Sequence, residues 1–214
     1  MSGIDLITPF QREVANAFFG MPESKGFILA GGAALIASDT VERVTEDLDF
    51  FAARGEAHVP TTKAAFLEMC EVRNWSTEIV YDNDEFVRLE VFGPDDSVPV
   101  DFGIDVTFLF PPIVTFLGPT VAPEENAGRK TLALFGRWRP RDFVDVYFLA
   151  RMFGKQRLLD LAAERDLGFD LGFFTQALRR VNFRHDEDYP ISSDQFDDMV
   201  AFFNEWADEI LEQP

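Results

Sequence analysis

The stretch Asp47-Leu48-Asp49 constrains this chain more than any other part of its sequence. Two carboxylates flank Leu48, and Phe50 follows them, so polar and apolar residues alternate. Because the side chains of a strand alternate between its two faces, Asp47 and Asp49 are expected on one side while Leu48 and Phe50 enter a core. Two like charges at this spacing repel each other, and a hard divalent cation between them relieves the repulsion. The pattern therefore predicts a Mg²⁺ or Mn²⁺ site with Asp47 and Asp49 as ligands.

A turn of small residues precedes this pair of carboxylates. Gly31 and Gly32 follow an apolar run at 27–29 and open a short apolar stretch that ends at Ser38. A Gly-Gly turn at the start of a helix presents backbone N–H groups to a phosphate; the alternative is a plain turn without a ligand. A phosphate-binding turn beside a carboxylate pair predicts metal-assisted chemistry on a nucleotide, with Gly31 and Gly32 in contact with the substrate.

The order of the predicted elements divides the chain into a mixed α/β half and a helical half. Hydrophobic periodicity predicts strands at 27–29, 47–51, 75–81, 86–92 and 98–110, and helices at 5–19, 33–38, 61–74, 122–135, 141–153, 158–165, 171–181 and 194–212. Pro111-Pro112 and Gly118-Pro119 favour a boundary between the two halves. The sequence therefore predicts an α+β fold, with a small mixed-sheet core at 1–118 and a helical C-terminal region at 119–214 packed on it.

A second polar cluster lies on the predicted helices of the C-terminal half. Lys130 and Arg137 frame an apolar stretch, and Arg141, Asp142 and Asp145 follow. Because residues three apart are neighbours on a helix, Asp142 and Asp145 are expected side by side. A Lys ammonium stabilises charge that develops on a triphosphate, and the forked donors of Arg suit phosphates. The cluster is therefore a candidate nucleotide-binding site; the alternative is a set of ion pairs within a helix bundle.

The two motifs together resemble the AbiEii (MenT-like) toxins of the nucleotidyltransferase superfamily. The first motif is Gly31-Gly32-Ala33-Ala34-Leu35 followed by Arg43-x-Thr45-x-Asp47-Leu48-Asp49-Phe50-Phe51, and the second is Lys130 to Arg137 followed by Arg141-Asp142-Phe143-Val144-Asp145. The resemblance covers roughly residues 27–153. It implies a nucleotidyltransferase core in which Asp47, Asp49, Lys130 and Asp145 are catalytic.

The resemblance also implies a third carboxylate on a strand beside the Asp-x-Asp strand, where it completes the metal site. Asp101 and Asp105 both lie on the predicted strand 98–110, on one face. The sequence leaves both candidates open, with a slight preference for Asp101. The alternative for either residue is a position on a solvent-facing strand without a metal. Thr45 matches the family motif either as a hydrogen-bond partner for the substrate or as a loop residue. Three roles are open for Asp145: it could orient Lys130, bind a metal, or accept a proton from the attacking hydroxyl.

By resemblance, the reaction moves an NMP from an NTP to RNA, such as a tRNA 3′ end, and the chain is a bacterial toxin with a cognate antitoxin as partner. The net charge of −19 argues against broad nucleic-acid binding. However, 12 of the 19 basic residues lie between Arg129 and Arg184, which predicts a basic patch on an acidic body. Nucleotidylation of a protein partner avoids the charge conflict. Transfer of a γ-phosphate, or a non-catalytic nucleotide- or partner-binding module, are further alternatives.

Cysteine usage, hydropathy and the tryptophans complete the expectations. The single Cys70 excludes an intramolecular disulfide and fits a reducing cytoplasm. No apolar run is long enough to span a membrane, and the first residues lack the pattern of a secretion signal, so no membrane partner is expected. Trp75 and Trp206 are expected in the core. Trp138 lies among arginines and is expected either to stack on a base of single-stranded RNA or to pack at a helix end.

Overall fold

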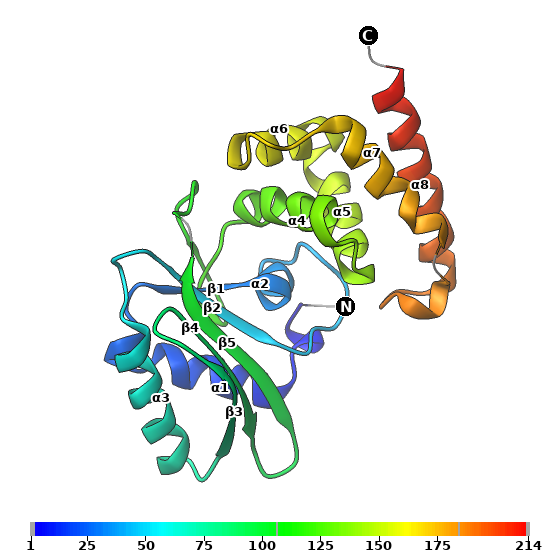
Figure 1. Cartoon of the computed structure of the whole chain (residues 1–214). Coiled ribbons are helices and arrows are strands. Elements are labelled where there is room, and N and C mark those ends of the chain that lie inside the picture. Colours follow the sequence, from blue (N-terminus) through cyan, green and yellow to red (C-terminus); the bar gives the residue numbers. More distant parts are fainter. Residues whose placement is uncertain (1–2, 106, 184, 213–214) are drawn as a thin grey trace. The chain divides into compact units, whose positions relative to one another are not determined.

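The computed structural model of the chain describes residues 3–105, 107–183 and 185–212. Two compact units follow one another along the sequence: unit 1 is Met1–Ala122 and unit 2 is Pro123–Pro214. Unit 1 contains a seven-stranded mixed sheet with helices, whereas the described part of unit 2 contains helices and no strand (Figure 1). This architecture confirms the predicted α+β class, with a mixed-sheet half followed by a helical half.

The sheet of unit 1 places the strands of the first motif near its centre. The helices are α1 (Pro9–Phe19), α2 (Gly31–Ala37) and α3 (Val59–Val72), with the 3-10 turns η1 (Gly3–Leu6) and η2 (Pro22–Ser24). The strands are β1 (Phe27–Ala30), β2 (Leu48–Ala53), β3 (Ser76–Asp82), β4 (Phe86–Phe92), β5 (Ser97–Asp105), β6 (Ile113–Thr115) and β7 (Gly118–Thr120). Their order is β3-β4-β5-β2-β1-β7-β6, in which β2 and β5 are parallel, β1 and β7 are parallel, and the other neighbours are antiparallel.

Aromatic packing holds α1 and α3 against one face of this sheet. Phe18 of α1 stacks on Phe50 of β2 with ring centroids 4.0 Å apart, and Phe66 of α3 meets Phe102 of β5 at 5.8 Å. All four rings are fully buried, and burial of such rings is a large favourable term in folding. Because Phe50 and Phe102 enter this core, the residues next to them in β2 and β5 point to the opposite face.

The segment after β5 differs from the prediction. The predicted strand 98–110 ends at Asp105, residues 107–110 are not in a strand, and Val106 lies outside the described residues. The predicted stiff connection instead forms the short hairpin β6–β7. Its order comes from a long-range contact, since Thr120 pairs with Leu29 of β1 and the Val121 N–H donates to the Leu29 carbonyl at 2.8 Å. No local pattern in this Pro-containing segment specifies that partner.

Unit 2 is organised around aromatic contacts between its helices. They are α4 (Pro123–Arg137), α5 (Pro140–Phe153), α6 (Lys155–Arg165), α7 (Leu171–Arg179) and α8 (Ser193–Leu211), with the 3-10 turns η3 (Arg180–Phe183) and η4 (Asp186–Asp188). Phe143 of α5 meets Phe203 of α8 edge to face at 5.4 Å, and Phe174 of α7 meets Trp206 at the same distance. Trp206 is buried here and Trp75 is buried in unit 1, as predicted.

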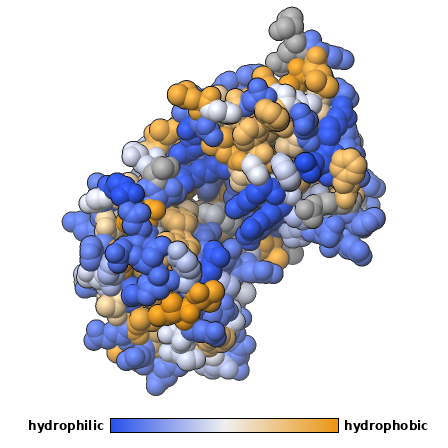
Figure 2. Space-filling model, viewed as in Figure 1, coloured by the Kyte–Doolittle hydropathy of each residue, from blue (hydrophilic) through white to orange (hydrophobic). Residues whose placement is uncertain are grey.

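The surface is mainly hydrophilic on the face shown in Figure 2, where separate apolar patches lie between charged and polar residues. Exposed apolar side chains in unit 1 include Val80 and Val114, and those in unit 2 include Phe173 and Phe183. Among the helices of the described residues, none combines the length and the apolar character that a membrane span requires.

Candidate active site

The tight turn from β1 into the first residues of α2 brings Gly31 and Gly32 into close contact with the residues that follow α2. Gly31 has a φ of +64°, in the left-handed region that favours glycine, and a Cβ added there would overlap the Asp49 carboxylate. A Cβ added to Gly32 would lie 2.6 Å from Thr45 Oγ1. Any larger residue at either position would displace these side chains. Both glycines are therefore required for the close packing of the turn against Asp49 and Thr45.

Hydrogen bonds fix the loop that leads from α2 into β2. Thr45 Oγ1 donates to Asp47 Oδ1 at 3.0 Å, and Gln11 Nε2 of α1 donates to the Thr45 carbonyl at 2.8 Å. The Arg43 guanidinium is buried and donates to the Val44 carbonyl at 2.8 Å. No local pattern predicts this role for Gln11, because its partner lies 34 residues further along the chain. These contacts orient the side chain of Asp47.

The register between β2 and β5 separates the two candidates for the third carboxylate. Asp101 lies directly opposite Asp49, whereas Asp105 lies opposite Ala53 at the other end of the paired strands. Residues in register on neighbouring parallel strands point to the same face, and the strands are about 4.8 Å apart. Asp49 and Asp101 therefore share one face, on the side away from the aromatic core. Asp101 is buried and Asp49 is partly exposed.

Arg88 of β4, which the sequence analysis missed, lies among these carboxylates. It is in register with Asp101, donates from Nε to Asp101 Oδ1 at 2.8 Å, and bonds through Nη2 to Asp101 Oδ2. The hydrogen bonds with Asp101 are the largest cause that raises the pKa of the Arg88 guanidinium, and partial burial opposes the rise. The negative charges of Asp101, Asp49 and Asp47 raise this pKa further.

The donor chemistry of this group fits a hard divalent cation. Asp47, Asp49 and Asp101, here called the carboxylate face, offer only oxygen ligands and all act electrostatically on one guanidinium. Within residues 3–105, 107–183 and 185–212, no three acidic, His or Cys side chains already lie in a metal-holding arrangement. Both oxygens of Asp101 bond to Arg88, so a metal at Asp101 would share these oxygens with the guanidinium or displace it.

In unit 2, the second cluster forms two ion pairs between α4 and α5. Lys130 Nζ lies 2.8 Å from Asp145 Oδ2, and both side chains are almost completely buried. Arg137 donates from Nε and Nη2 to the two oxygens of Asp142, each at 2.8 Å. Asp142 is buried, while the Arg137 side chain is 45% exposed. Arg141, in the first turn of α5, is partly exposed.

The two pairs allow different chemistry. Asp145 holds the Lys130 ammonium in one position, which suits it to stabilise negative charge that develops at a fixed point. Asp142 binds the Nε–Nη2 edge of the Arg137 guanidinium in a bidentate geometry. Because nearly half of the Arg137 side chain is exposed, this group can meet a phosphate from solution.

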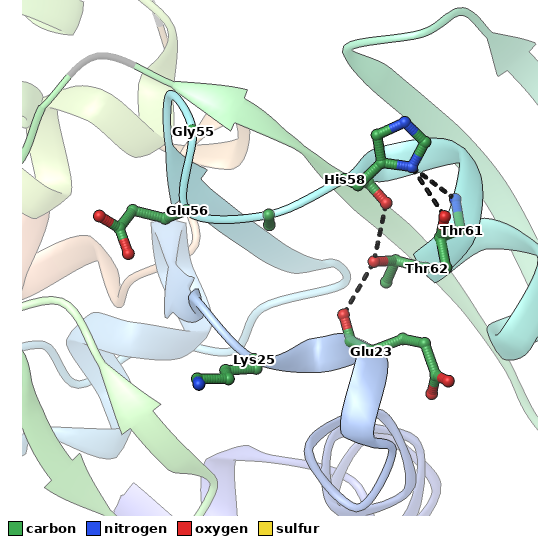
Figure 3. Close-up of a pocket in the computed structure, with 8 residues that line it drawn as sticks. Glu23, Lys25, Gly55, Glu56, His58, Thr61 and Thr62 are labelled. Carbon is green, nitrogen blue, oxygen red and sulfur yellow. Dashed lines mark hydrogen bonds between the residues drawn. The ribbon is translucent and has the colours of Figure 1, made fainter.

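A hollow of about 510 Å³ in unit 1 lies at the other end of the β1–β2 pair from Asp49 (Figure 3). The residues that line it lie in η2 and just after it, in the loop that follows β2, and at the start of α3. None of the predicted site residues belongs to this lining. The polar groups in Figure 3 have local roles: His58 Nδ1 accepts from the Thr61 backbone N–H at 3.3 Å, and Thr62 Oγ1 donates to the Glu23 carbonyl at 2.9 Å. They cap α3 and tie it to η2.

Comparisons with known proteins agree with the motifs. The family model described as "Nucleotidyl transferase AbiEii toxin, Type IV TA system" matches residues 18–209. The crystal structure of JHP933 from Helicobacter pylori is similar with a TM-score of 0.63 at 17% identity, over 97% of this chain and 91% of that chain. MenT4, a nucleotidyltransferase toxin from Mycobacterium tuberculosis, is similar with a TM-score of 0.58 at 16% identity, over 96% of this chain and 82% of that chain. No curated protein sequence matches the chain. At these identities the structural likenesses establish the fold, and the family match spans both motifs.

Proposed function

The chain belongs to the AbiEii family of nucleotidyltransferase toxins, and from this premise we propose that it moves a nucleoside monophosphate from an NTP to an RNA acceptor. A hydroxyl of the acceptor loses its proton to water and attacks the α-phosphate, the bond between the α-phosphorus and the bridging oxygen breaks, and pyrophosphate leaves. The acceptor to test first is a tRNA 3′ end. As in other toxin–antitoxin systems, a cognate antitoxin is the expected protein partner.

The observation that carries this proposal is the register of Asp49 with Asp101, beside the Gly31–Gly32 turn. We assign Asp47, Asp49 and Asp101 as metal ligands and leave Asp105 out, because its partner in register is Ala53. A divalent ion bound there, Mg²⁺ or Mn²⁺, would neutralise negative charge on the triphosphate. The backbone amides of the turn and the Thr45 hydroxyl, which already contacts Asp47, would orient the phosphates.

The residues of unit 2 supply the positive charge in this proposal. Lys130 stabilises the charge that develops on the leaving pyrophosphate. Asp145 positions the Lys130 ammonium, with Oδ2 2.8 Å from Nζ. Arg137 and Arg141 bind phosphate oxygens, and Asp142 holds Arg137 in the correct plane through its two hydrogen bonds. Each of these groups binds or orients, and none needs to form a covalent intermediate.

The test is transfer of label from NTPs. Each of the four NTPs, labelled with ³²P at the α-phosphate, is incubated with the full chain, Mg²⁺ or Mn²⁺, and either purified tRNA or a lysate that contains RNA and protein. Asp49→Asn removes one charge from the carboxylate face without changing side-chain volume. Asp95→Asn, in the exposed loop between β4 and β5, removes the same charge elsewhere in unit 1 and is the matched control.

We expect a labelled RNA band with the unchanged chain and with Asp95→Asn, and no band with folded Asp49→Asn. Label on a protein band instead would replace the RNA acceptor with a protein acceptor and keep the chemistry. Label that transfers only from γ-labelled NTP would show a phosphotransferase. Absence of transfer from either label, with NTP binding intact by calorimetry, would leave a nucleotide-binding module and refute the proposal.

A further inference from the structure

A second hollow, of about 280 Å³, lies within unit 2 beside the end of α4. Trp138, Arg180, Phe183 and Asp188 line it. Trp138 directly follows the last residue of α4, Arg180 and Phe183 begin and end η3, and Asp188 ends η4. We call this site the Trp138 hollow. Its volume is below the roughly 300–1,000 Å³ of pockets for drug-sized ligands, so it suits a single planar group better than a complete nucleoside triphosphate.

Trp138 is held in an unusual backbone conformation at this site. Its φ is +51°, a region that L residues other than glycine rarely adopt. The indole Nε1 donates to the Phe135 carbonyl at 3.1 Å, which fixes the orientation of the ring. Residues kept in such conformations against a local cost are concentrated at functional sites. The hydrogen bond to Phe135 confirms the expected packing of Trp138 at the end of a helix, and it leaves the indole partly exposed beside the hollow.

The guanidinium of Arg180 stacks on this indole. Its central carbon lies 3.6 Å from the ring centroid, within the range of a cation–π contact. Arg180 is exposed, as is Arg139 on the other side of Trp138 in the sequence. Neither guanidinium has an ion pair or a hydrogen bond within the part of the chain that the structure describes. Their donors thus remain available for the phosphates that flank a bound group.

The other two residues complete a small recognition site. Phe183 is 83% exposed, which offers an aromatic surface at the edge of the hollow. Asp188 accepts a hydrogen bond from the His185 N–H through Oδ2 at 3.2 Å. Its Oδ1 has no hydrogen bond with any described residue and can accept one from a ligand N–H. Stacking surfaces, a hydrogen-bond acceptor and unpaired cations are the features by which proteins bind an unstacked base.

We propose that the Trp138 hollow binds one unpaired nucleobase of the single-stranded RNA acceptor. The base stacks on the Trp138–Arg180 pair, and Arg139 and Arg180 contact the adjoining phosphates. This inference rests on the proposed function, since it assigns the acceptor to RNA. It also gives a role to the basic stretch 129–184 in a chain of net charge −19; Arg184, the last residue of that stretch, lies outside the described residues.

The experiment measures binding of RNA without any NTP, so that no transfer takes place. A short single-stranded RNA with a fluorescent label is titrated with the full chain, with Arg180→Ala and with Trp138→Ala, and anisotropy gives each Kd. Loss of one base–aromatic contact is expected to weaken binding about tenfold. Arg73→Ala is the matched control, because Arg73 also lies over an indole, that of Trp75 at 5.2 Å, but outside the hollow. Thermal melting confirms that each variant is folded.

Quenching of tryptophan emission gives a second readout. Trp75 and Trp206 are buried and Trp138 is partly exposed, so RNA should quench the unchanged chain and Arg73→Ala, and quench Arg180→Ala only at higher RNA concentration. Equal Kd values for the unchanged chain, Arg180→Ala and Trp138→Ala would overturn the proposal. Mononucleotides that compete with RNA at equal concentration would overturn the assignment to an RNA strand.

The outcome separates this proposal from the proposed function. Transfer of label to RNA with an unchanged KM for RNA in Arg180→Ala would refute the Trp138 hollow and keep the transferase. Weakened RNA binding by Arg180→Ala, in a chain that labels no RNA, would refute transfer to RNA and keep the hollow as an RNA-binding site.

Discussion

The Arg88–Asp101 pair of unit 1 and the Lys130–Asp145 pair of unit 2 differ in how far their cation is shielded from solvent. In unit 1, three carboxylates act on one guanidinium, Arg88, whose side chain is 53% exposed. In unit 2, the side chains of Lys130 and Asp145 are 9% and 0% exposed. An exposed ion pair contributes little to stability and exchanges partners readily, whereas breaking a buried pair leaves an uncompensated charge. The Arg88 pair is therefore suited to exchange its cation, as is the Arg137 pair of unit 2, whereas Asp145 keeps the Lys130 ammonium.

The largest expected effect comes from removing a partner of the buried pair. Lys130→Met leaves the Asp145 carboxylate buried without its ammonium, and we expect the free energy of unfolding to fall by about 3–5 kcal/mol. Urea denaturation followed by circular dichroism measures it. Lys155→Met is the matched control, because its partners Glu205 and Glu209 are 69% and 47% exposed, and a loss of about 1 kcal/mol or less is expected. Equal losses in the two variants would break the comparison.

A smaller effect, on catalysis alone, is expected from Asp101→Asn. Removing one preorganised electrostatic contact with a transition state lowers kcat about 10²–10³-fold, and a lost metal ligand belongs to this class. Asp105→Asn makes the same change on the same strand, opposite Ala53 instead of Asp49, and we expect it to retain activity. Transfer of ³²P from α-labelled NTP to the acceptor gives both rates. The opposite ranking would assign the third carboxylate to Asp105.

Local sequence patterns predicted many residues of the carboxylate face and of the Lys130 cluster. The residues and pairs that they could not predict depend on contacts between distant parts of the chain. Period-two alternation predicted Asp47 and Asp49 on one side, whereas the predicted strands 86–92 and 98–110 gave no register for Arg88. Since Phe92 pairs with Ser97, counting back along both strands puts Arg88 opposite Asp101. The composition of the 93–97 loop does not specify that first pair, so the position of Arg88 opposite Asp101 depends on the register of the hairpin.

The choice between Asp101 and Asp105 was different, because it depends on the register of β5 with β2. These strands are separated by α3 and two further strands, so nothing in their local sequence sets that register. Likewise, helix periodicity placed Asp142 and Asp145 as neighbours on α5, whereas the pairing of Asp145 with Lys130 depends on how α4 packs against α5. Contacts of this kind are determined by tertiary packing.

The exchange of cations in unit 1 can be tested without turnover. Arg88→Ala removes the guanidinium that bonds both oxygens of Asp101, and we expect Mn²⁺ to bind several-fold more tightly by isothermal titration calorimetry. The Arg88 side chain is 53% exposed, but its loss leaves the Asp101 side chain, 9% exposed, without its guanidinium. The fall in unfolding free energy should therefore lie between the roughly 1 kcal/mol of an exposed pair and the roughly 3–5 kcal/mol of a buried one. Arg54→Ala, which breaks an exposed pair with Glu85, should leave the Mn²⁺ affinity unchanged. Weaker Mn²⁺ binding in Arg88→Ala would mean that Arg88 supports the metal site instead of competing for it.

The smallest expected effect concerns Cys70. It tests whether solvent reaches only the carboxylate face of unit 1 or also its core. Cys70 of α3 is buried, and burial raises the pKa of its thiol from 9.0 to about 12, against an opposing effect of the Arg73 charge. In the unfolded chain the thiol ionises near its ordinary pKa, so the folded state binds more protons above pH 9. This contribution to stability is therefore complete below about pH 9 and declines as the pH rises towards 12.

Two measurements on Cys70 follow from that sign. The folded chain should react with a thiol reagent at pH 8 only as fast as it unfolds, and urea should restore the full rate. The free energy of unfolding should fall more steeply between pH 9 and 10 for the unchanged chain than for Cys70→Ala, which cannot ionise at this position. Fast labelling of the folded chain would show that solvent reaches the core under the sheet. In that case solvent would reach the core of unit 1 as well as its carboxylate face, and the exposure of Arg88 would not be a local property.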